Sequence, residues 1–148
     1  MGLGRRDDDS GSSAAPFMIA LGVVVIVLIA IGLISLFGRE ADMDQEQIIR
    51  ATIGQNDALQ RVDHDAYASY TCPEQTPDAA ELTRRQHDSS AERGPRYVED
   101  VVDVSVDGDT ATAKAVYFFE SNRDEKVDAT IDYVRADGQW KVCSATPS

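Results

Sequence analysis

Hydrophobic residues are distributed along the chain in three successive patterns. The first is an unbroken apolar run of about 21 residues over 17–37, the length with which an α-helix crosses a hydrocarbon core ~30 Å thick. Beyond it, apolar residues recur at spacings of three and four, and from residue 96 they alternate with polar residues. These periods predict a membrane-spanning helix, then shorter amphipathic helices, then β-strands.

The apolar run is expected to be an uncleaved membrane anchor rather than a signal peptide. Its length exceeds the roughly 7–15 apolar residues of a signal peptide, and no A-x-A-like cleavage site follows it. A buried helix of a soluble core is excluded, because the run is apolar on every face and the rest of the chain is too small to enclose it. We expect a disordered cytoplasmic tail over 1–16, the span over 17–37, a linker over 38–43 and an extracytoplasmic domain over 44–148.

The two cysteines decide the expected orientation, because arginines lie on both sides of the run and the positive-inside rule gives no clear answer. Cys72 and Cys143 form an even pair in a small domain, which is typical of a disulfide in an oxidising compartment. The alternative is a pair of reduced thiols in the cytosol. We expect the disulfide, and with it a single-pass protein of the plasma membrane whose N-terminus is cytoplasmic.

One feature of the last strand complicates this pairing. Strict alternation places Cys143 on the strand face opposite Trp140 and Val142, which look more like core residues. A bridge to Cys72 therefore requires a bulge or twist near the strand end, or packing of Trp140 and Val142 on the far face of the sheet.

The segment between the membrane and the first strand is predicted to be helical. Its apolar residues form one stripe, made of Ile49, Ile53, Leu59, Val62, Ala66 and Tyr70. A gap in the stripe near Gly54 predicts a kink, and Asp63 is a suitable N-cap for a short second helix. A further helix is expected to begin with Thr76 as N-cap and Pro77 in its first turn, and to end at Gly94.

Four runs with a period of two follow, separated by turn residues, and they predict an antiparallel meander. The runs are 97–106, 110–120, 126–135 and 139–145. In the first run, Val102, Val104 and Val106 are expected to share the buried face. In the second run, three alanines, Tyr117 and Phe119 form the expected inner row. Small alanines on an inner face leave room for a closely packed helix or for a cavity.

The order of elements and two short motifs carry a family resemblance. Helices followed by a meander that ends in Asp-Gly-Gln-Trp-Lys-Val (137–142) resemble the nuclear-transport-factor-two-like superfamily, in which a curved sheet wraps around helices. With the anchor and the motif Tyr-Ala-Ser-Tyr-Thr-Cys-Pro-Glu (67–74), the chain is similar to small single-pass membrane proteins of mycobacteria and related actinobacteria. Some of these are akin to lumazine-binding-like or Mce-associated domains.

The resemblance implies a fold, a disulfide and an extracytoplasmic address. The expected fold class is α+β: one transmembrane helix, then a cone-like domain in which N-terminal helices pack on a curved antiparallel sheet of four or slightly more strands. The resemblance implies no activity, since this fold hosts enzymes, binding modules and dimerisation domains alike.

Candidate catalytic groups are few. His64 lies between Asp63 and Asp65 and near Tyr67, which is a suitable setting for a general base in a pocket. A polar triplet at a helix start is more simply a solvated cap, so no catalytic residue is predicted. The sequence has no His-x-x-x-His, Cys-x-x-Cys or Asp-x-Asp-x-Asp-Gly motif, so neither a metal nor a cofactor is expected.

Charge and aromatic residues limit the partners. The chain has a formal net charge of −12, and its part from residue 38 onward has 23 acidic and 12 basic residues. Nucleic acid is therefore disfavoured as a ligand, because its phosphates require a basic face. The residues expected to line a pocket or the core are Tyr67, Tyr70, Ala113, Ala115, Tyr117, Phe119, Ile131, Tyr133 and Trp140.

Two functions remain open from the sequence. The favoured one is a membrane-anchored, non-catalytic module that binds a small apolar ligand or a protein partner at the cell envelope, as an accessory subunit of a transport complex. The alternative is a pocket enzyme of the isomerase or dehydratase kind found in the superfamily. A His–Asp or Tyr–Asp pair at the base of a closed pocket would favour the enzyme, and an alanine-filled cone with His64 in solvent would favour the binding module.

Overall fold

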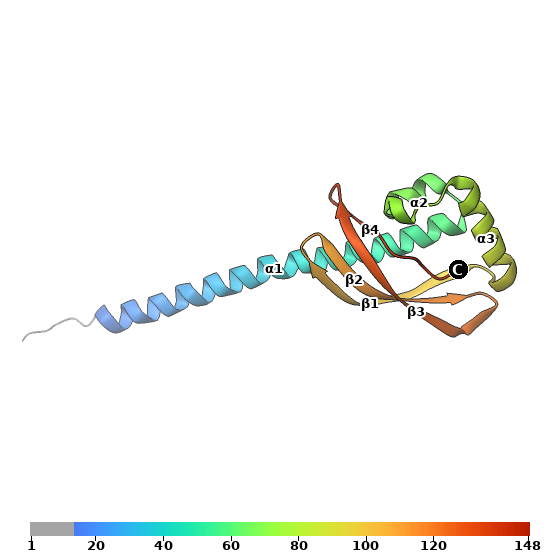
Figure 1. Cartoon of the computed structure of the whole chain (residues 1–148). Helices are drawn as coiled ribbons and strands as arrows, with labels where there is room; N and C mark the ends of the chain where they lie inside the picture. The colour runs from blue at the N-terminus through green and yellow to red at the C-terminus, as the bar shows by residue number, and fades with distance from the viewer. Residues whose placement is uncertain (1–13) are drawn as a thin grey trace, which may run out of the picture. The chain divides into compact units, whose positions relative to one another are not determined.

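The structure, a computed structural model, describes residues 14–148 and divides the chain into two units, Met1–Arg39 and Glu40–Ser148. Most of the tail predicted to be disordered, 1–13, lies outside the described residues. In the described part, helices precede strands along the chain (Figure 1). The elements are α1 (Ala14–Gln60), α2 (His64–Tyr70), the 3₁₀ helix η1 (Pro73–Gln75), α3 (Ala79–Arg93), β1 (Arg96–Asp107), β2 (Thr110–Phe119), β3 (Asn122–Ala136) and β4 (Gln139–Val142).

In the first unit, the described residues belong to α1 and present apolar side chains to the surroundings. Every side chain from Met18 to Leu36 is exposed. Among the residues that the structure describes, this is the one helix long and apolar enough to cross a membrane. The segment 38–43, predicted as a linker, is helical and belongs to α1 as well.

In the second unit, β1 to β4 form one curved antiparallel sheet in chain order, as the period of two predicts (Figure 1). Two of the three connections between neighbouring strands are tight turns at Asp-Gly pairs. Gly108 has a φ of +59° between β1 and β2, and Asp137 and Gly138 have φ values of +53° and +74° between β3 and β4. Asp and Gly tolerate these left-handed angles best, which explains the turn positions. The predicted α+β fold class is confirmed.

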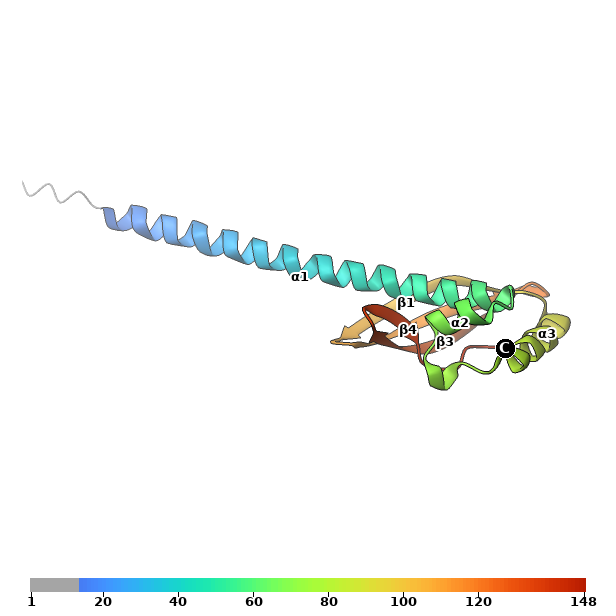
Figure 2. The same cartoon turned by 90° about the horizontal axis from the view of Figure 1, so that it is seen from above.

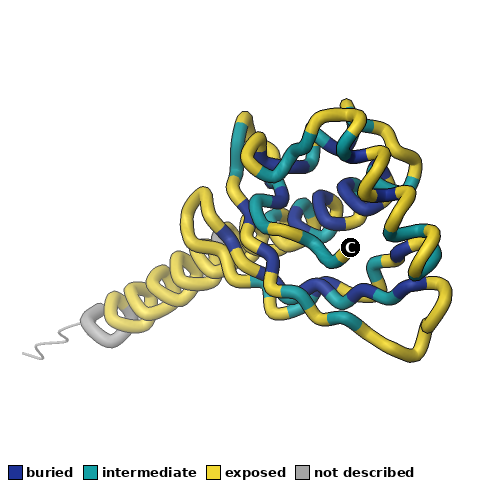
Figure 3. Tube along the Cα trace, turned by 45° about the vertical axis from the view of Figure 1, so that its right-hand side comes forward, coloured by how far each residue is buried: buried dark blue, intermediate teal, exposed yellow. Residues whose placement is uncertain are grey.

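The second half of α1 and the short helix α2 cover one face of the sheet (Figure 2). The core between them is built from Ile48, Ala51, Val101, Ala111, Ala113, Ala115, Tyr117, Ile131, Tyr133, Trp140 and Val142. Buried stretches of α1 and of the strands face one another in this layer (Figure 3). Ile48 and Ala51 of α1 pack in one cluster with the alanines of β2, so side chains fill the interior of the cone.

The buried face of α1 differs from the predicted stripe. Ile53 is 51 % exposed, whereas Thr52, Gln55 and Asn56 are buried. The prediction was wrong, because the buried face is rotated about the helix axis relative to the predicted stripe. These polar residues are buried because each has a partner: Thr52 Oγ1 lies 2.7 Å from the hydroxyl of Tyr133, for example. Hydrogen bonding removes most of the penalty for burying a polar group, so hydrophobicity alone does not identify the inner face.

The predicted kink at Gly54 is also wrong, since α1 continues to Gln60. Gly54 serves a close approach instead. A Cβ atom at this position would lie 2.6 Å from Cζ of Tyr70, so the ring of Tyr70 packs directly on the helix backbone. A glycine within a helix can permit such contact without ending the helix.

Two further local predictions need correction. Helix α3 has Asp78 as its N-cap, and the Asp78 side chain accepts a hydrogen bond of 2.8 Å from the amide of Glu81. Thr76, the predicted cap, donates to the carbonyl of Cys72 instead. The predicted end at Gly94 and the Asp63 cap of α2 are confirmed.

The inner row of β1 changes parity within the strand. Val101 is buried, Val102 is only half-buried opposite Lys114, and the residue after it, Asp103, has a φ of +55°. A bulge between Val102 and Ser105 accounts for the change, because an extra residue shifts the side-chain alternation. Val102 therefore leaves the predicted row, whereas Val104 packs against the core and Val106 pairs with Ala111 of the inner row of β2, although Val106 is 38 % exposed.

The expected disulfide joins Cys72 and Cys143, whose Cα atoms lie 4.9 Å apart. β4 ends at Val142, so Cys143 is no longer bound to the strand alternation, while Trp140 and Val142 are buried in the core. The amide of Cys72 donates to the carbonyl of Val142 over 2.8 Å. The end of α2 thus runs beside the end of β4, which brings the two sulfur atoms together.

Candidate ligand-binding site

A cavity of about 220 Å³ lies at the end of the helical layer in the second unit. Its walls come from the ends of α1 and α2, from α3, from the start of β1 and from the C-terminal segment 144–148. The lining residues are Leu59, Tyr67, Gln75, Pro77, Leu82, Arg85, Gln86, Ser89, Arg96, Ser144, Ala145, Thr146, Pro147 and Ser148. The walls are therefore part apolar and part polar, and they carry two arginines.

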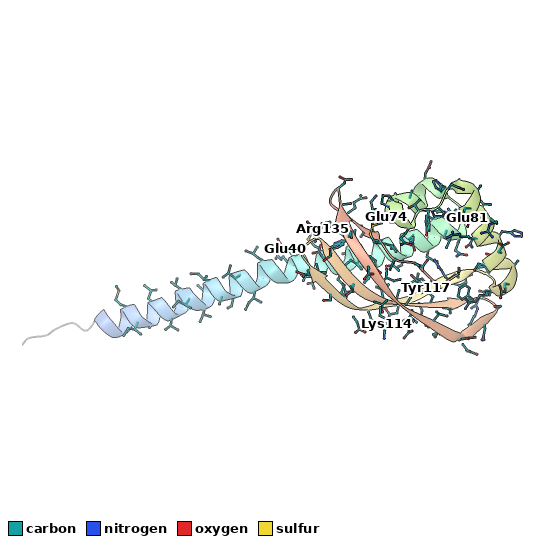
Figure 4. The ribbon with its side chains drawn as sticks, in the orientation of Figure 1. Glu40, Glu74, Glu81, Lys114, Tyr117 and Arg135 are labelled. Atoms are coloured by element: carbon teal, nitrogen blue, oxygen red, sulfur yellow. A yellow bond between two sulfur atoms is a disulfide. The ribbon has the colours of Figure 1, made fainter. Side chains whose placement is uncertain are left out.

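Arg96 is the most unusual residue of this cavity, because it is a charged residue only 3 % exposed. It is the first residue of β1 and pairs with Phe119 of β2, in the row of β2 that faces the helices. Its side chain therefore points into the domain, over the ring of Tyr117, with Cζ of Arg96 4.8 Å from the ring centre. Figure 4 shows Tyr117 on the side of the sheet that faces α3, and Lys114 on the opposite side.

The hydrogen bonds of Arg96 go to neutral acceptors. Nε donates to Oδ1 of Asn56 over 2.8 Å, and Nη1 donates to the hydroxyl of Thr146 over 3.0 Å and to the carbonyl of Pro147. Asn56 in turn donates to the carbonyl of Arg96 over 3.1 Å. The guanidinium is thereby fixed between α1 and the C-terminal segment.

No carboxylate side chain among residues 14–148 forms an ion pair with Arg96. Burial lowers the pKa of Arg96, although a guanidinium remains protonated at any physiological pH. An isolated buried charge is unfavourable unless it is paired. The site is thus electrostatically incomplete.

Several donors around Arg96 lack an acceptor. Nη2 of Arg96, Nε2 of Gln60 and the hydroxyl of Tyr117 are buried and have no hydrogen-bond partner among the described residues. Gln60 borders Arg96 directly, since Oε1 of Gln60 accepts from the amide of Arg96 over 3.3 Å. An arrangement of unpaired donors around a buried cation is suited to an acceptor with negative charge.

The tyrosines near Arg96 are weak candidates for acid–base chemistry. Burial raises the pKa of Tyr67 and of Tyr117, and the charge of Arg96 opposes this rise only in part. A tyrosine with a raised pKa ionises less readily at neutral pH, so both hydroxyl groups act as hydrogen-bonding groups here.

Of the residues predicted to line a pocket or the core, only Tyr67 belongs to this cavity. Tyr70 packs on Gly54, and together with Trp140 it borders an open depression beside α1. The others form the packed core and are buried: Ala113, Ala115, Tyr117, Phe119, Ile131 and Tyr133.

His64 does not meet a carboxylate in a pocket. Its Nε2 lies 2.9 Å from the carbonyl oxygen of Pro77, and its Nδ1 lies 3.7 Å from the carboxylate of Asp65, which is fully exposed. The imidazole therefore joins the start of α2 to the segment before α3. His87 is exposed on α3. Within the described residues, no cluster of His, Cys, Asp or Glu is suited to a metal ion.

Sequence reasoning missed Arg96, Asn56 and Gln60 as site residues. The alternation of β1 contained one signal for Arg96. This residue falls at an inward-facing position, where it pairs with Phe119 of the inner row of β2. A charged residue at an inward position needs a partner or a ligand. The contribution of 144–148 had no signal, since this segment has no periodicity.

Comparison with known proteins places the fold but not the family. No protein-family model matches the chain, and no curated protein matches it by sequence. Among solved structures, a protein of unknown function with a cystatin-like fold from Nostoc punctiforme is similar with a TM-score of 0.53 and 12 % identity, over 68 % of this chain and 86 % of that chain. A protein of unknown function from Mycobacterium tuberculosis is similar with a TM-score of 0.50 and 14 % identity, over 70 % of each chain.

A proposed dehydratase of the NTF2-like family from Streptomyces avermitilis shares 21 % identity with this chain, over 72 % of this chain and 99 % of that chain, at a TM-score of 0.44. The likenesses to the proteins from Nostoc punctiforme and Mycobacterium tuberculosis define the class at the level of fold. The second unit is an α+β cone of the cystatin-like kind, in agreement with the fold expected from the sequence resemblance.

Proposed function

We propose that the chain is a single-pass membrane protein whose second unit is a non-catalytic binding module outside the cytoplasm. The observation that carries this proposal is the cavity at Arg96. It combines apolar walls with a buried cation and amide donors, which are groups that bind and orient a ligand. A guanidinium that never loses its proton is unsuited to act as a general base.

The exposed apolar segment of α1 supports the anchor. From Met18 to Leu36, large apolar side chains are exposed on all sides; Ile34, for example, is 71 % exposed. Such a surface is unfavourable in water but matches the hydrocarbon of a bilayer, where a helix satisfies all its backbone hydrogen bonds internally. We infer that this segment spans the plasma membrane.

The disulfide supports an extracytoplasmic address for Glu40–Ser148. Cytosolic glutathione and thioredoxin keep most thiols reduced, and stable disulfides are typical of compartments beyond the membrane. The bridge between Cys72 and Cys143 joins the helical layer to the last strand. We propose further that this unit belongs to an envelope transport complex, because the chain resembles Mce-associated and related actinobacterial membrane proteins.

The enzyme alternative has less support from the geometry. A dehydratase or isomerase of this fold needs an acid–base pair that faces a cavity. Here the cone is filled by α1 against the alanines of β2, and His64 bonds to a backbone carbonyl. The remaining cavity holds Arg96, Tyr67 and amide side chains.

The proposal is tested by purifying the full chain from its native membranes in mild detergent and identifying retained small molecules by native mass spectrometry. Ser89→Trp places a large side chain on the cavity wall, and His87→Trp places the same side chain on the exposed side of α3. We expect a retained molecule with the wild type and His87→Trp but not with Ser89→Trp. Chemical conversion of that molecule by the wild type would support the enzyme instead.

A further inference from the structure

The basic residues around the cavity contrast with the rest of the chain, which is strongly acidic. Arg85 lines the cavity, Arg96 forms its buried end, and Arg93 donates to the main-chain oxygen of Ser148 over 3.0 Å. Arg85 is ion-paired with Glu81, whereas neither Arg93 nor Arg96 forms an ion pair with a carboxylate side chain of residues 14–148. Arg93 and Arg96, which have no such partner in so acidic a domain, create a local positive potential.

The C-terminal segment 144–148 occupies the acceptor positions around these arginines. Thr146 and Pro147 supply a hydroxyl and a carbonyl to Arg96, and Ser148 supplies a main-chain oxygen to Arg93. The two acceptors of Arg96 are neutral groups, and they lie on a segment that follows the last strand and has no strand partner of its own. A carboxylate would add charge–charge attraction and a second parallel hydrogen bond to the guanidinium, neither of which a hydroxyl or a carbonyl supplies.

From this geometry we infer that the cavity binds the carboxylate of a small organic acid, and that Arg96 is the residue that holds it. The carboxylate takes the place of the oxygens of Thr146 and Pro147 and engages Nη1 and the unpartnered Nη2 together, which is the paired geometry that a guanidinium fork favours. The apolar body of the acid lies against Leu59, Leu82 and Tyr67. This inference rests on the proposed binding function and names its ligand class.

The apolar part of the wall distinguishes an organic acid from an inorganic oxyanion. Leu59, Leu82 and the ring of Tyr67 offer no hydrogen bonds, whereas an inorganic phosphate presents oxygens in all directions. A ligand with one charged end and an apolar end matches both parts of the wall. The cavity volume of about 220 Å³ limits the ligand to a small molecule.

The segment 144–148 competes with the ligand for Arg96. Its removal is therefore expected to strengthen binding, although removal of a wall from an ordinary pocket would weaken it. A chain that stops after Ser144 keeps the hydrogen bond from the amide of Asp132 to the hydroxyl of Ser144, and it loses the competing acceptors together with the other lining residues of 145–148. A gain in ligand affinity after the truncation would therefore identify 144–148 as a segment that the ligand displaces, and a loss would identify it as a structural wall.

The experiment measures benzoate binding to the full chain in detergent micelles by calorimetry at constant ionic strength. Benzamide, a neutral molecule of the same shape, and inorganic phosphate are the comparison ligands. We expect benzoate to bind at least tenfold more tightly than either, Arg96→Gln to lose at least tenfold in benzoate affinity, and the chain that stops after Ser144 to gain at least threefold. Arg123→Gln, at an exposed arginine paired with Glu120, is the matched control and should bind like the wild type.

Three results would overturn the inference: equal binding of benzoate and benzamide, phosphate binding as tight as that of benzoate, or an unchanged or weaker benzoate affinity after removal of 145–148. The last readout does not depend on any variant at Arg96, so it decides the matter even if Arg96→Gln fails to fold. If these results fail but the wild type retains another molecule that Ser89→Trp does not retain, the carboxylate ligand is rejected. The binding function then still stands.

Discussion

Removal of the disulfide between Cys72 and Cys143 is expected to cost the second unit a large share of its stability. The two residues are separated by 71 positions in the sequence. For a loop of this length the chain-entropy model gives a stabilisation of about 4 kcal/mol, because the bridge restricts the unfolded chain. Domains of this size are stable by about 5–15 kcal/mol, so the loss amounts to roughly a quarter or more of the total.

This estimate assigns the whole loss of stability to the greater freedom of the unfolded chain, so it holds only if the native contacts persist without the disulfide. Two hydrogen bonds hold the ends in place: the amide of Cys72 donates to Val142 over 2.8 Å, and the amide of Cys143 donates to Asp132 over 2.7 Å. Alanine is the suitable replacement, because Cys72 is buried and a serine hydroxyl there would need a partner. The variant is therefore Cys72→Ala with Cys143→Ala.

Urea unfolding of the full chain in detergent, followed by the fluorescence of Trp140, measures the effect. Trp140 is the one tryptophan of the sequence and is buried in the core of the second unit, so its signal reports on that unit. We expect the unfolding free energy to fall by about 4 kcal/mol, with a corresponding shift of the midpoint.

Reductant supplies the control for this measurement. It should destabilise the wild type by a similar amount and leave the double alanine variant unchanged. A loss below about 1 kcal/mol, or equal sensitivity of both proteins to reductant, would refute the reasoning from loop entropy.

Two further predictions concern a buried hydrogen bond and a titrating carboxylate. Thr52→Val should lower the unfolding free energy in urea by about 1–3 kcal/mol, because it leaves the buried hydroxyl of Tyr133 without its partner at 2.7 Å. Adding Tyr133→Phe to this variant should recover most of that loss. Simple additivity of the two changes would contradict this prediction. Hydrogen bonds from Arg84, and then from Arg85, lower the pKa of Glu81 to about 2, so the stability that this carboxylate contributes is complete above its unfolded pKa and is lost as the pH falls toward 2. Glu81→Gln should accordingly be less stable than the wild type at pH 7 and equally stable near pH 2, whereas a difference that persists at pH 2, or a pKa of Glu81 near 4.5 by NMR titration, would refute this assignment.

The sequence alone determined the features that depend on local chemistry. The length and uniform apolarity of 17–37 indicate a helix suited to a membrane, and the period of two with Asp-Gly turns predicts the four-stranded meander. The caps at Asp63 and Gly94 also follow from local preferences, since a short side-chain acceptor and a residue that tolerates positive φ fit those positions. The α+β class follows from the order of these elements.

The tertiary structure decided which face of α1 is buried and where a ligand could bind. Thr52 and Asn56 look like outward positions in the sequence, yet they are buried because Tyr133 and Arg96 supply hydrogen bonds from strands far along the chain. The bulge at Asp103 likewise changes the inner row of β1 in a way that alternation does not reveal. Arg96 acquires its significance only when the fold removes it from water and brings no carboxylate side chain of the described residues to it, because the cost of a buried charge depends on its three-dimensional surroundings.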